Sequence, residues 1–393
     1  MENFHATKST PRIFLIFHGR FPGEKAAAIF AAKNAEAFAD AGMAVTFLAP
    51  RRIGRAKKTP AEFYGIKNNF KVVYVPTIDL FFLPFLKRFA FVVSYALFSK
   101  MVLLYLLLYA QKDDAMYSNE ALPLLFASFR FPNTVYEVHD FPRDTRFYRM
   151  LFPRVRLAIV TNRWKQKHIA ELFSVPEAKL LCEPNAVDIE SFSKASSEVS
   201  LRKSYGIPEA AFLVGYAGSL RTMGMEKGIE TLLRAMKMLG GDFKALIIGG
   251  SKSDVNYYTK MAVGMGIEKN LVFTGWVKHS SVPQYLKTCN VLAAPFPKTD
   301  HYNFYMSPMK IFEYMASGVP IVASDLNSIR EIVDNDSAFL VEPENAEALA
   351  HGISQAVAAR SESEKRAGRA LEIARGHSWQ KRAERIISRL NTL

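Results

Sequence analysis

Short apolar runs alternate with stretches of helical periodicity along most of this chain. In the first half the apolar runs predict strands at residues 12–17, 44–49, 71–75, 115–118, 134–138, 157–160 and 179–183. Between several of them lie amphipathic helices, such as those predicted at 26–41 and 164–173. A second series predicts strands at 212–217, 244–248, 270–274, 291–295, 319–323 and 338–341. This alternation predicts two α/β domains, each a doubly wound, mostly parallel sheet with helices on both faces.

A polar, serine-rich stretch from Ser191 to Ser204 separates the two series and predicts an interdomain linker. Helical patterns at 345–359, 362–374 and 378–390 close the chain. We therefore predict an N-terminal domain over 1–192, a C-terminal domain over 193–377 and a final helix over 378–393. Ligands bind at the carboxyl ends of the strands in such sheets, so we expect the two domains to face a central cleft.

The composition is consistent with two hydrophobic cores and restricts the classes of binding partner. The chain has 393 residues, 49% of them hydrophobic, and its two cysteines lie far apart, which favours a reduced compartment over a disulfide framework. Net charge is +14, and the first 194 residues carry 27 lysines and arginines against 17 acidic residues. Acidic small molecules, anionic lipid headgroups and nucleic acid could all explain this excess. Because no nucleic-acid-binding module is recognisable, we expect no nucleic-acid partner.

One apolar segment bears on localisation. Residues 89–109 are mostly Phe, Leu, Val, Tyr and Met, they follow Lys87-Arg88, and Lys100 interrupts them. The length permits a spanning helix, although Lys100 argues against one. A buried helix and a helix docked on a membrane surface also fit. Since no signal-peptide core precedes the first strand, we expect a cytoplasmic protein, with 80–109 as the candidate contact with an anionic membrane.

The stretch from Ser307 to Gly318 carries the first candidate site. Ser307 as N-cap and Pro308 as first helical residue predict a short helix that ends at Ser317. The free amides at 309–311, beside the Lys310 ammonium, would form an anion site. Glu313, one turn deeper, could accept two hydrogen bonds from a ribose diol, so the pattern suits a nucleotide. An ordinary capped helix is the alternative.

A second anion element follows the strand at 212–217. Gly215 and Gly218 would let the backbone come close to a ligand, and Arg221 and Lys227 add two cations to the same loop. The loop suits a diphosphate. Glycine-rich strand ends are common, so this element alone leaves a purely structural role open.

Together these strings resemble the retaining nucleotide-sugar glycosyltransferases of the GT-B fold, family 4 (glycosyl transferases group 1). The matching strings are Gly-Tyr-Ala-Gly-Ser-Leu (215–220) with Lys227-Gly228, Leu-Ile-Ile-Gly-Gly (246–250), Val-Phe-Thr-Gly-Trp-Val (272–277), Ser-Pro-Met-Lys-Ile-Phe-Glu-Tyr-Met-Ala-Ser-Gly-Val-Pro-Ile-Val-Ala-Ser (307–324) and Glu-Pro-Asn-Ala-Val-Asp (183–188). The resemblance covers nearly the whole chain and is strongest from Gly215 to Ser324.

The resemblance implies a donor site in the C-terminal domain. Arg221 and Lys227 would neutralise the donor diphosphate, and Glu313 would bind the ribose. The amides after Ser307-Pro308 would hold the phosphate and sugar, while the turn at 249–250 and the strand end at 276–277 would form the wall beside the nucleobase. The donor-binding set is Gly218, Ser219, Arg221, Lys227, Gly249, Gly250, Trp276, Val277, Ser307, Pro308, Met309, Lys310 and Glu313. Trp276 could equally belong to the core.

In the N-terminal domain, similar proteins place a histidine near the transferred sugar, and here His139 follows a strand beside Asp140. The predicted catalytic residues are thus His139, Lys227 and Arg221. Gly19, Gly23 and Lys25 with Asp140 would form the acceptor and phosphate loop. The final segment from Ser378 resembles the helix that crosses back onto the N-terminal domain in GT-B enzymes.

The chain departs from the family pattern in three places. The usual adjacent glycines of the first loop are replaced by Phe21-Pro22-Gly23. Tyr305 stands where many members have the first of two glutamates, so other atoms must take over that glutamate's contact with the donor sugar. Arg221 is displaced by two positions from the family's arginine, and a longer loop precedes Lys227.

The resemblance implies metal-independent transfer of a sugar from a nucleotide-diphosphate sugar, such as a UDP- or GDP-sugar, with retention of configuration and no cofactor. The basic first half and the apolar segment suggest a lipid-linked or other cell-envelope glycan as acceptor, as in polysaccharide biosynthesis. Two alternatives stay open: a nucleotide-sugar 2-epimerase of the same fold, and a non-catalytic nucleotide-binding protein. A dehydrogenase is disfavoured because the first strand lacks a following Gly-x-Gly-x-x-Gly.

Overall fold

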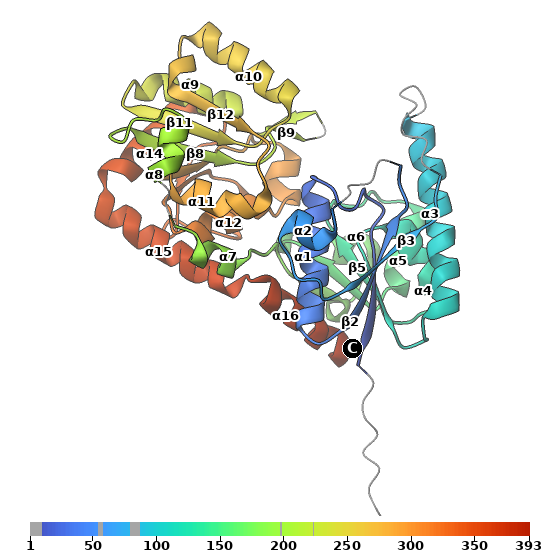
Figure 1. Ribbon diagram of the computed structural model, residues 1–393. Helices are drawn as coiled ribbons and strands as arrows, with labels where there is room; N and C mark the ends of the chain where they lie inside the picture. Colours follow the sequence, from blue (N-terminus) through green and yellow to red (C-terminus); the bar gives the residue numbers. More distant parts are fainter. Residues whose placement is uncertain (1–9, 54–57, 79–86, 197–198, 223) are drawn as a thin grey trace, which may run out of the picture. The chain divides into compact units, whose positions relative to one another are not determined.

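The structure, a computed structural model, describes residues 10–53, 58–78, 87–196, 199–222 and 224–393, except for the side chains of 87–89, 199 and 222 (Figure 1). Segment 80–86 of the predicted membrane contact, and the side chains of the basic pair before the apolar stretch, therefore lie outside the described residues. The chain forms two compact units, one made of Met1–Glu183 with Trp379–Leu393 and the other of Pro184–Ser378.

The first unit is built on a parallel sheet with the strand order β3-β2-β1-β4-β5-β6-β7. Its strands are β1 (Arg12–Ile16), β2 (Ala44–Pro50), β3 (Lys71–Val75), β4 (Ala115–Ser118), β5 (Thr134–Val138), β6 (Leu157–Val160) and β7 (Leu180–Cys182). All neighbouring pairs are parallel. Every strand of this sheet lies where the apolar runs predicted it, because a parallel strand buried on both faces is apolar throughout.

Helices connect these strands and cover the sheet. The connecting helices are α1 (Ala26–Asp40), α2 (Pro60–Tyr64), α3 (Lys87–Tyr109), α4 (Ala121–Ser128), α5 (Arg146–Arg154) and α6 (Arg163–Phe173). The helix α16 (Trp379–Thr392), near the end of the chain, packs against α1. Side chains of α3 to α6 form one core with the sheet, in which Phe98, Leu124, Phe152 and Ile169 are fully buried.

The last helix, α16, is tied to the first unit by buried charges. Arg382 of α16 is fully buried; it forms an ion pair with Glu137 of β5 and donates a hydrogen bond to the Asn34 side chain of α1 at 3.2 Å. Arg385 forms a second, bidentate pair with Glu183 at 2.6 and 2.8 Å. Because an unpaired buried charge is costly, these partners strongly favour this position of α16.

Helix α3 packs with one face and exposes the other. Ala90, Ser94, Phe98, Val102 and Leu106 are all buried, and the spacing of four residues places them on one side of the helix. Only 28% of the apolar window over Ala90–Tyr109 is buried inside the protein, and its length and composition alone would allow it to cross a membrane. Of the alternatives that the sequence left open, a wholly buried helix does not hold for the described residues of α3, because much of this helix is exposed.

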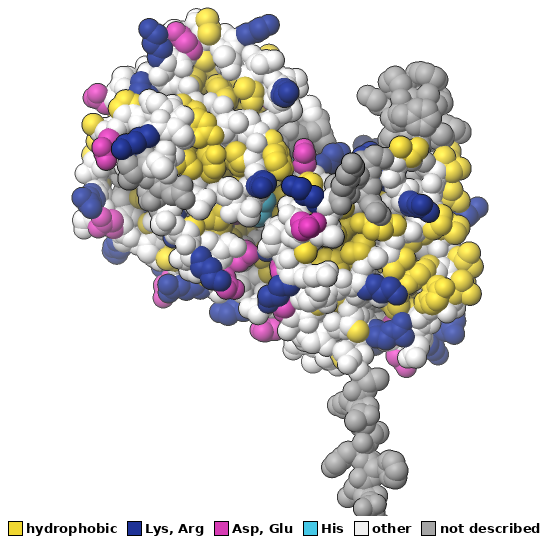
Figure 2. Space-filling model, viewed as in Figure 1, with side chains coloured by type: hydrophobic (Ala, Val, Ile, Leu, Met, Phe, Trp, Pro, Cys, Tyr) yellow, Lys and Arg dark blue, Asp and Glu magenta, His cyan; other side chains and the backbone are white. Residues whose placement is uncertain are grey.

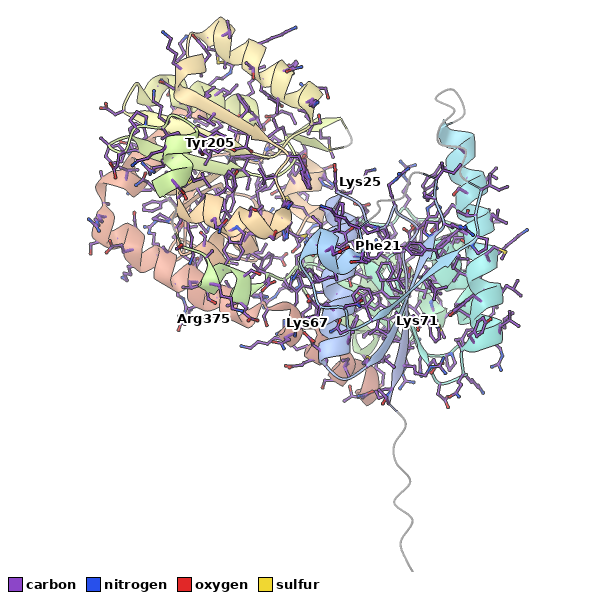
Figure 3. The ribbon with its side chains drawn as sticks, viewed as in Figure 1. Phe21, Lys25, Lys67, Lys71, Tyr205 and Arg375 are labelled. Atoms are coloured by element: carbon purple, nitrogen blue, oxygen red, sulfur yellow. The ribbon has the colours of Figure 1, made fainter. Side chains whose placement is uncertain are left out.

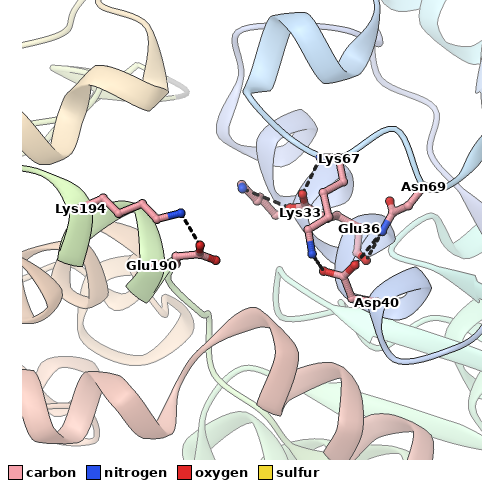
Figure 4. A network of polar contacts seen from close by, with 7 residues as sticks. All are labelled: Lys33, Glu36, Asp40, Lys67, Asn69, Glu190 and Lys194. Carbon is pink, nitrogen blue, oxygen red and sulfur yellow. Dashed lines mark hydrogen bonds and ion pairs between the residues drawn. The ribbon is translucent and has the colours of Figure 1, made fainter.

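The outer face of α1 is joined by polar contacts to the residues between α2 and β3 (Figure 4). Lys67 Nζ pairs with Asp40 at 2.7 Å, the Asn69 amide donates to Asp40 at 2.9 Å, and the Lys67 backbone amide donates to Glu36 at 2.7 Å. In the second unit, Glu190 and Lys194 pair along one helix, as Figure 4 also shows. Each exposed pair of this kind contributes little to the stability of the protein. We assign these pairs no function.

The second unit has a parallel sheet with the order β12-β11-β8-β13-β14-β15. Its strands are β8 (Phe212–Ala217), β11 (Phe243–Ile248), β12 (Leu271–Gly275), β13 (Val291–Ala294), β14 (Ile321–Ser324) and β15 (Phe339–Val341). A two-stranded hairpin, β9 (Arg221–Thr222) with β10 (Met225–Glu226), was not predicted. The predicted pair of doubly wound parallel sheets is confirmed.

Helices cover both faces of this second sheet. They are α7 (Ile189–Lys194), α8 (Val199–Ser204), α9 (Ile229–Leu239), α10 (Lys252–Met265), α11 (Val282–Lys287), α12 (Met309–Ser317), α13 (Asn327–Arg330), α14 (Ala346–Ala358) and α15 (Arg360–Gly376). On one face Leu292 of β13 packs with α11, α12 and α15; on the other, Ala293 packs with α9, α10 and α14. Successive strand residues thus reach two separate cores.

The stretch predicted as a linker is folded. Much of Ser191–Ser204 lies in α7 and α8, and Phe192 and Leu201 are buried in the core of the second unit. The unit begins at Pro184, so the boundary predicted at residue 192 falls inside α7. The serines misled the prediction because Ser191, Ser193, Ser200 and Ser204 are exposed residues of two short helices that are held to the core by Phe192 and Leu201.

Candidate functional site

The predicted donor residues gather at the carboxyl edge of the second sheet. Gly218 follows β8, Gly249 follows β11 and Trp276 follows β12, and these three strands are neighbours. The chain from β13, the next neighbour of β8, leads into α12. This edge is where doubly wound sheets bind their ligands.

Two glycines bring bare backbone to this edge. Gly218 and Gly249 have φ values of +127° and +106°, and a Cβ on Gly249 would lie 2.6 Å from the Gly218 carbonyl oxygen. The Gly218 amide donates to Ile248 and the Gly249 amide to Gly275, both at 2.9 Å. Gly250 follows with φ +91°. At Gly249 only glycine permits this approach, since a side chain there would be both strained and in collision with the Gly218 backbone.

The start of α12 differs from the prediction. The helix begins at Met309, Pro308 occupies the N-cap position, and no side chain caps it, so Ser307 is not the cap. Instead the Ser307 hydroxyl accepts a hydrogen bond from the Asn185 amide at 3.1 Å, and its carbonyl accepts one from the Asn185 side chain. A tertiary partner, distant in sequence, thus replaces the local cap.

The anion site at this helix is smaller than predicted. The Ile311 amide donates to the Pro308 carbonyl at 3.0 Å, so it is not free. The Met309 and Lys310 amides lie in the first turn, where the helix supplies no acceptor. These two amides remain as candidate anion donors.

Lys310 is the most unusual cation of the site. The residue is 8% exposed, and its Nζ lies 3.6 Å from the centre of the Tyr216 ring and 4.9 Å from that of Phe296. Among the described residues, this Nζ has no hydrogen-bond partner. Burial, and then the charge of Lys227, lower the pKa of Lys310 well below its usual value.

Lys227 lies in the loop between β10 and α9. Its Nζ donates a hydrogen bond to the Ser219 hydroxyl at 2.9 Å, and burial lowers its pKa to about 8. The next residue, Gly228, has φ +84°, and a Cβ there would lie 1.5 Å from the Pro295 carbonyl oxygen. This close approach anchors the loop against the segment after β13, which fixes the backbone that carries Lys227.

Arg221 is held by aromatic rings of α10. Its guanidinium carbon lies 4.0 Å from the centre of the Tyr257 ring and 5.4 Å from that of Tyr258. The charge is therefore already engaged by a cation–π contact in this structure. Its role toward a diphosphate stays a prediction.

Glu313 has a partner that the sequence did not reveal. Its Oε1 lies 2.8 Å from His279 Nε2, in the short helical turn His279–Ser281. Thirty-four positions separate the two residues, and no local motif marks such a pair. The histidine orients the carboxylate through one of its two oxygens.

The wall predicted at the end of β12 is partly exposed. Trp276 is 53% exposed, so the alternative of a plain core residue does not hold, whereas Val277 packs against the core. Tyr305, at the position of the family's first glutamate, ends a short π-helix (His301–Tyr305) and is half-buried. An aromatic phenol thus occupies the carboxylate position.

In the first unit, His139 directly follows β5 and is half-buried. Its ring meets Phe30 edge-on with centroids 4.6 Å apart, and its Nε2 lies 3.5 Å from Glu137 Oε1. Burial, and then the charges of Lys165 and Arg382, lower its pKa to about 3, so the ring is neutral near pH 7. Nε2 is itself buried. Asp140, beside it, is exposed.

The predicted phosphate loop is occupied by its own contacts. The Gly23 amide donates to the Tyr64 hydroxyl at 2.6 Å, and this hydroxyl donates to the Gly23 carbonyl at 2.9 Å. Phe21 is buried and stacks on Phe47 of β2 with centroids 4.1 Å apart. Lys25 is exposed and precedes α1 (Figure 3). Phe21 therefore serves as an apolar anchor where the family has a glycine.

A buried polar cluster in the first unit was missed. His18, after β1, lies with its Nε2 at 3.1 Å from Arg52 and 3.3 Å from Ser94 Oγ, while Glu120 accepts from the His18 amide at 3.2 Å. Burial and Arg52 lower the pKa of His18 to about 4. Each of His18, Arg52 and Glu120 closely follows a neighbouring parallel strand, and this position is the signal that could have revealed them.

No group of three or more His, Cys, Asp or Glu side chains is placed to hold a metal ion in the part of the chain that the structure describes. The site offers cations, amides and hydroxyls instead. The structure brings together Gly218, Ser219, Lys227, Gly249 and Lys310, a set that can receive an anion against exposed backbone.

The segment that contains these residues resembles known proteins. Residues 211–359 match the family model described as glycosyl transferases group 1. An uncharacterized glycosyltransferase of Methanocaldococcus jannaschii is 26% identical over 202 residues, which are 50% of this chain and 49% of that protein. The UDP-Gal:α-D-GlcNAc-diphosphoundecaprenol α-1,3-galactosyltransferase of Escherichia coli is 25% identical over 193 residues, 48% of this chain and 47% of that protein. The chain thus spans about half the length of the curated relatives it matches.

Solved structures resemble the chain over nearly its whole length. HepE of Anabaena, in complex with UDP-glucose, superposes with a TM-score of 0.73 at 20% identity, covering 97% of this chain and 100% of that one. Sucrose-phosphate synthase of Thermosynechococcus elongatus gives 0.78 at 17% identity, covering 97% and 98%. These likenesses confirm the predicted GT-B fold. The segment 211–359, which resembles the glycosyl transferases group 1, contains the cations and glycines described above.

Proposed function

We propose that the protein transfers a glycosyl group from a nucleotide-diphosphate sugar to an acceptor, with retention of configuration and without a metal ion. The observation that carries the proposal is the set of Lys227, Lys310 and the glycine backbone at the carboxyl edge of the second sheet, within the segment that matches the family model. Two relatives, by name, act in teichuronic acid and lipopolysaccharide core biosynthesis, which supports a glycan of the cell envelope as product.

The proposed glycosyl transfer requires cations that stabilise the leaving diphosphate and does not require a protein nucleophile. As the sugar leaves, negative charge builds on the diphosphate, and fixed donors that face this charge lower the barrier. Lys227 and the first amides of α12 supply such donors, and the lysine charges replace the metal ion that other transferases use. In the retaining reaction as proposed, the acceptor attacks on the face that the diphosphate leaves, and a phosphate oxygen takes the proton.

A nucleotide-sugar screen tests the proposal. Purified protein is incubated with UDP- and GDP-sugars, with and without EDTA, and thermal stabilisation and nucleotide release are measured. We expect at least one sugar nucleotide to stabilise the protein and to be hydrolysed slowly, with no effect of EDTA. A change of donor configuration without acceptor would instead support the 2-epimerase, and binding without turnover on any acceptor would support a non-catalytic nucleotide-binding protein.

Replacement of Glu313 by alanine should weaken nucleotide-sugar binding about 10- to 100-fold, as expected for loss of hydrogen bonds to a charged acceptor. Titration calorimetry with the donor found in the screen measures the change. Glu372→Ala, at an exposed ion pair of α15, is the control and should leave the affinity unchanged. Unchanged affinity in Glu313→Ala would remove the ribose assignment.

For the acceptor side, we propose that the exposed face of α3 docks on an anionic membrane and gives access to a lipid-linked acceptor. Leu104, Leu107 and Leu108 are 48%, 52% and 68% exposed. Figure 2 shows hydrophobic side chains over this helix with basic side chains nearby. Lys100 on α3 and Lys112 just beyond it are exposed. An apolar helix face bordered by lysines is suited to the headgroup region of an anionic bilayer.

Flotation with liposomes tests this docking. Wild-type protein should float with vesicles that contain phosphatidylglycerol and much less with phosphatidylcholine alone, while the double variant Leu104→Glu/Leu108→Glu should remain in the soluble fraction. Met238→Glu, at a residue of α9 that is 55% exposed, is the matched control and should float like the wild type. Equal flotation with neutral and anionic vesicles would contradict the proposal.

A further inference from the structure

The ammonium of Lys310 has no acceptor, although it is surrounded by protein. The residue is 8% exposed, its Nζ lies 3.6 Å from the Tyr216 ring centre, and no hydrogen-bond partner is present among the described residues. An ammonium in this position has lost its water and gained only the π faces of two rings. A cation–π contact offsets part of that loss but not all of it.

The charged groups near Lys310 do not offset the cost of burying its ammonium. Lys227 lowers the pKa of Lys310, and Glu313 and Glu226 raise it by smaller amounts. Glu313 faces His279 at 2.8 Å, and Glu226 accepts a hydrogen bond from the Glu230 amide at 3.0 Å. Tyr216 contacts Lys310 directly, and Tyr314 lies on the same helix. Burial raises the pKa of both tyrosines, so their hydroxyls are neutral near pH 7.

Lys310 lies close to Gly218, an exposed residue. A Cβ added to this glycine would lie 3.5 Å from Lys310 Cε and 3.6 Å from Nζ, so exposed backbone without a side chain borders the buried amine. The Lys310 side chain begins in the first turn of α12, where the amides of 309 and 310 lack helical acceptors. A lysine amine without a hydrogen-bond partner, two amides without helical acceptors and bare backbone thus lie at one place.

We propose that Lys310 is the second cation of the anion site, alongside Lys227, and that it is neutral in the empty site and takes up a proton when the anion binds. The identity of the anion as a donor diphosphate rests on the proposed function. Empty, the neutral amine avoids the cost of an unpaired buried charge; with two phosphate charges nearby, the ammonium becomes the favoured form. Arg221, engaged by Tyr257, is not needed for this role.

Titration calorimetry in buffers of different ionisation enthalpy counts the proton. UDP-glucose and GDP-mannose are suitable probes because their diphosphates do not titrate near neutral pH. With MOPS and Tris at pH 7.5, the observed enthalpy should change with the buffer, corresponding to net uptake of a proton by the wild-type protein. In Lys310→Arg, which stays charged, binding should persist while most of this uptake is lost. Lys310→Met should lose the uptake and bind more than 10-fold more weakly.

Thermal unfolding of the ligand-free variants gives a second readout. Lys310→Met should be as stable as the wild type or more stable, since methionine fills the same space without a polar atom. Binding of a nucleotide sugar without buffer dependence would overturn the proton uptake and leave the proposed function intact. Uptake that persists unchanged in Lys310→Arg would assign the proton to Lys227 and overturn the inference. Failure of the whole donor panel to bind would overturn the proposed function together with it.

Discussion

Replacement of Lys227 by alanine is expected to lower kcat for glycosyl transfer about 100- to 1,000-fold, the usual effect of removing one fixed donor that faces a developing negative charge. Lys227 is positioned for this role by its hydrogen bond to Ser219 and by the close approach of Gly228 to Pro295. Steady-state kinetics with the donor identified by the screen measure the loss. Lys237→Ala, at an exposed lysine of α9, the helix that follows the loop of Lys227, is the control and should retain full activity.

The pH dependence of kcat/KM distinguishes the effect of the Lys227 charge from the effect of its side-chain packing. Burial lowers the pKa of Lys227 to about 8, so the ammonium is present below this pH and is lost above it. We therefore expect a downward step in kcat/KM for the donor as the pH rises through about 8. This step should appear in kcat/KM because that quantity reports the protonation state of the free enzyme. In Lys227→Arg this step should be absent, since arginine keeps its charge. A wild-type profile without a step near pH 8 would show that the Lys227 charge does not control donor capture.

Replacement of Gly228 by alanine should cause the largest loss of stability. A Cβ there would lie 1.5 Å from the Pro295 carbonyl oxygen and 2.4 Å from its carbonyl carbon, in a backbone with φ +84°. Because the obstacle is backbone, either the β13 segment or the start of α9 must move. We expect a loss of more than about 4 kcal/mol in the free energy of unfolding, the range of exceptional single substitutions.

A variant of a second glycine with positive φ separates the effect of the collision at Gly228 from the effect of backbone strain. Gly266, after α10, has φ +70°, and nothing lies within 4 Å of its would-be Cβ. Gly266→Ala should therefore lose only about 1–2 kcal/mol, the cost of left-handed backbone for an L-residue. Urea unfolding followed by circular dichroism compares the two midpoints. Similar midpoints in both variants would mean that the contact with Pro295 does not anchor the loop of Lys227.

Local patterns predicted the elements with strong apolar signals. All strands of both large sheets lie within a few residues of their predicted positions, because parallel strands are apolar along their whole length. Helices α2, α4, α5 and α10 were not predicted, and the serines of α7 and α8 were interpreted as a linker. These elements are short or polar outside, so their formation depends on packing more than on their own periodicity.

The residues of the site followed a similar division. Glycines and lysines after strand ends were visible in the sequence, since their order along the chain matches the resemblance at 215–324. The pairings were not: His279 with Glu313, Asn185 with Ser307, and His18 with Arg52 each join residues at least 34 positions apart. Such pairs depend on the sheet order, which one sequence does not reveal.

The first feature of the chain to suggest a ligand, the helix after Ser307, shows where sequence reasoning ends. The sequence by itself determined that a short helix ends at Ser317, that Lys310 lies in its first turn, and that the chain contains two doubly wound sheets. Only the tertiary structure decided that Ser307 binds Asn185 instead of capping, and that Lys310 lies between two rings without an acceptor. Periodicity and turn chemistry act between neighbours in sequence, whereas burial and charge balance are properties of what the fold brings around a side chain.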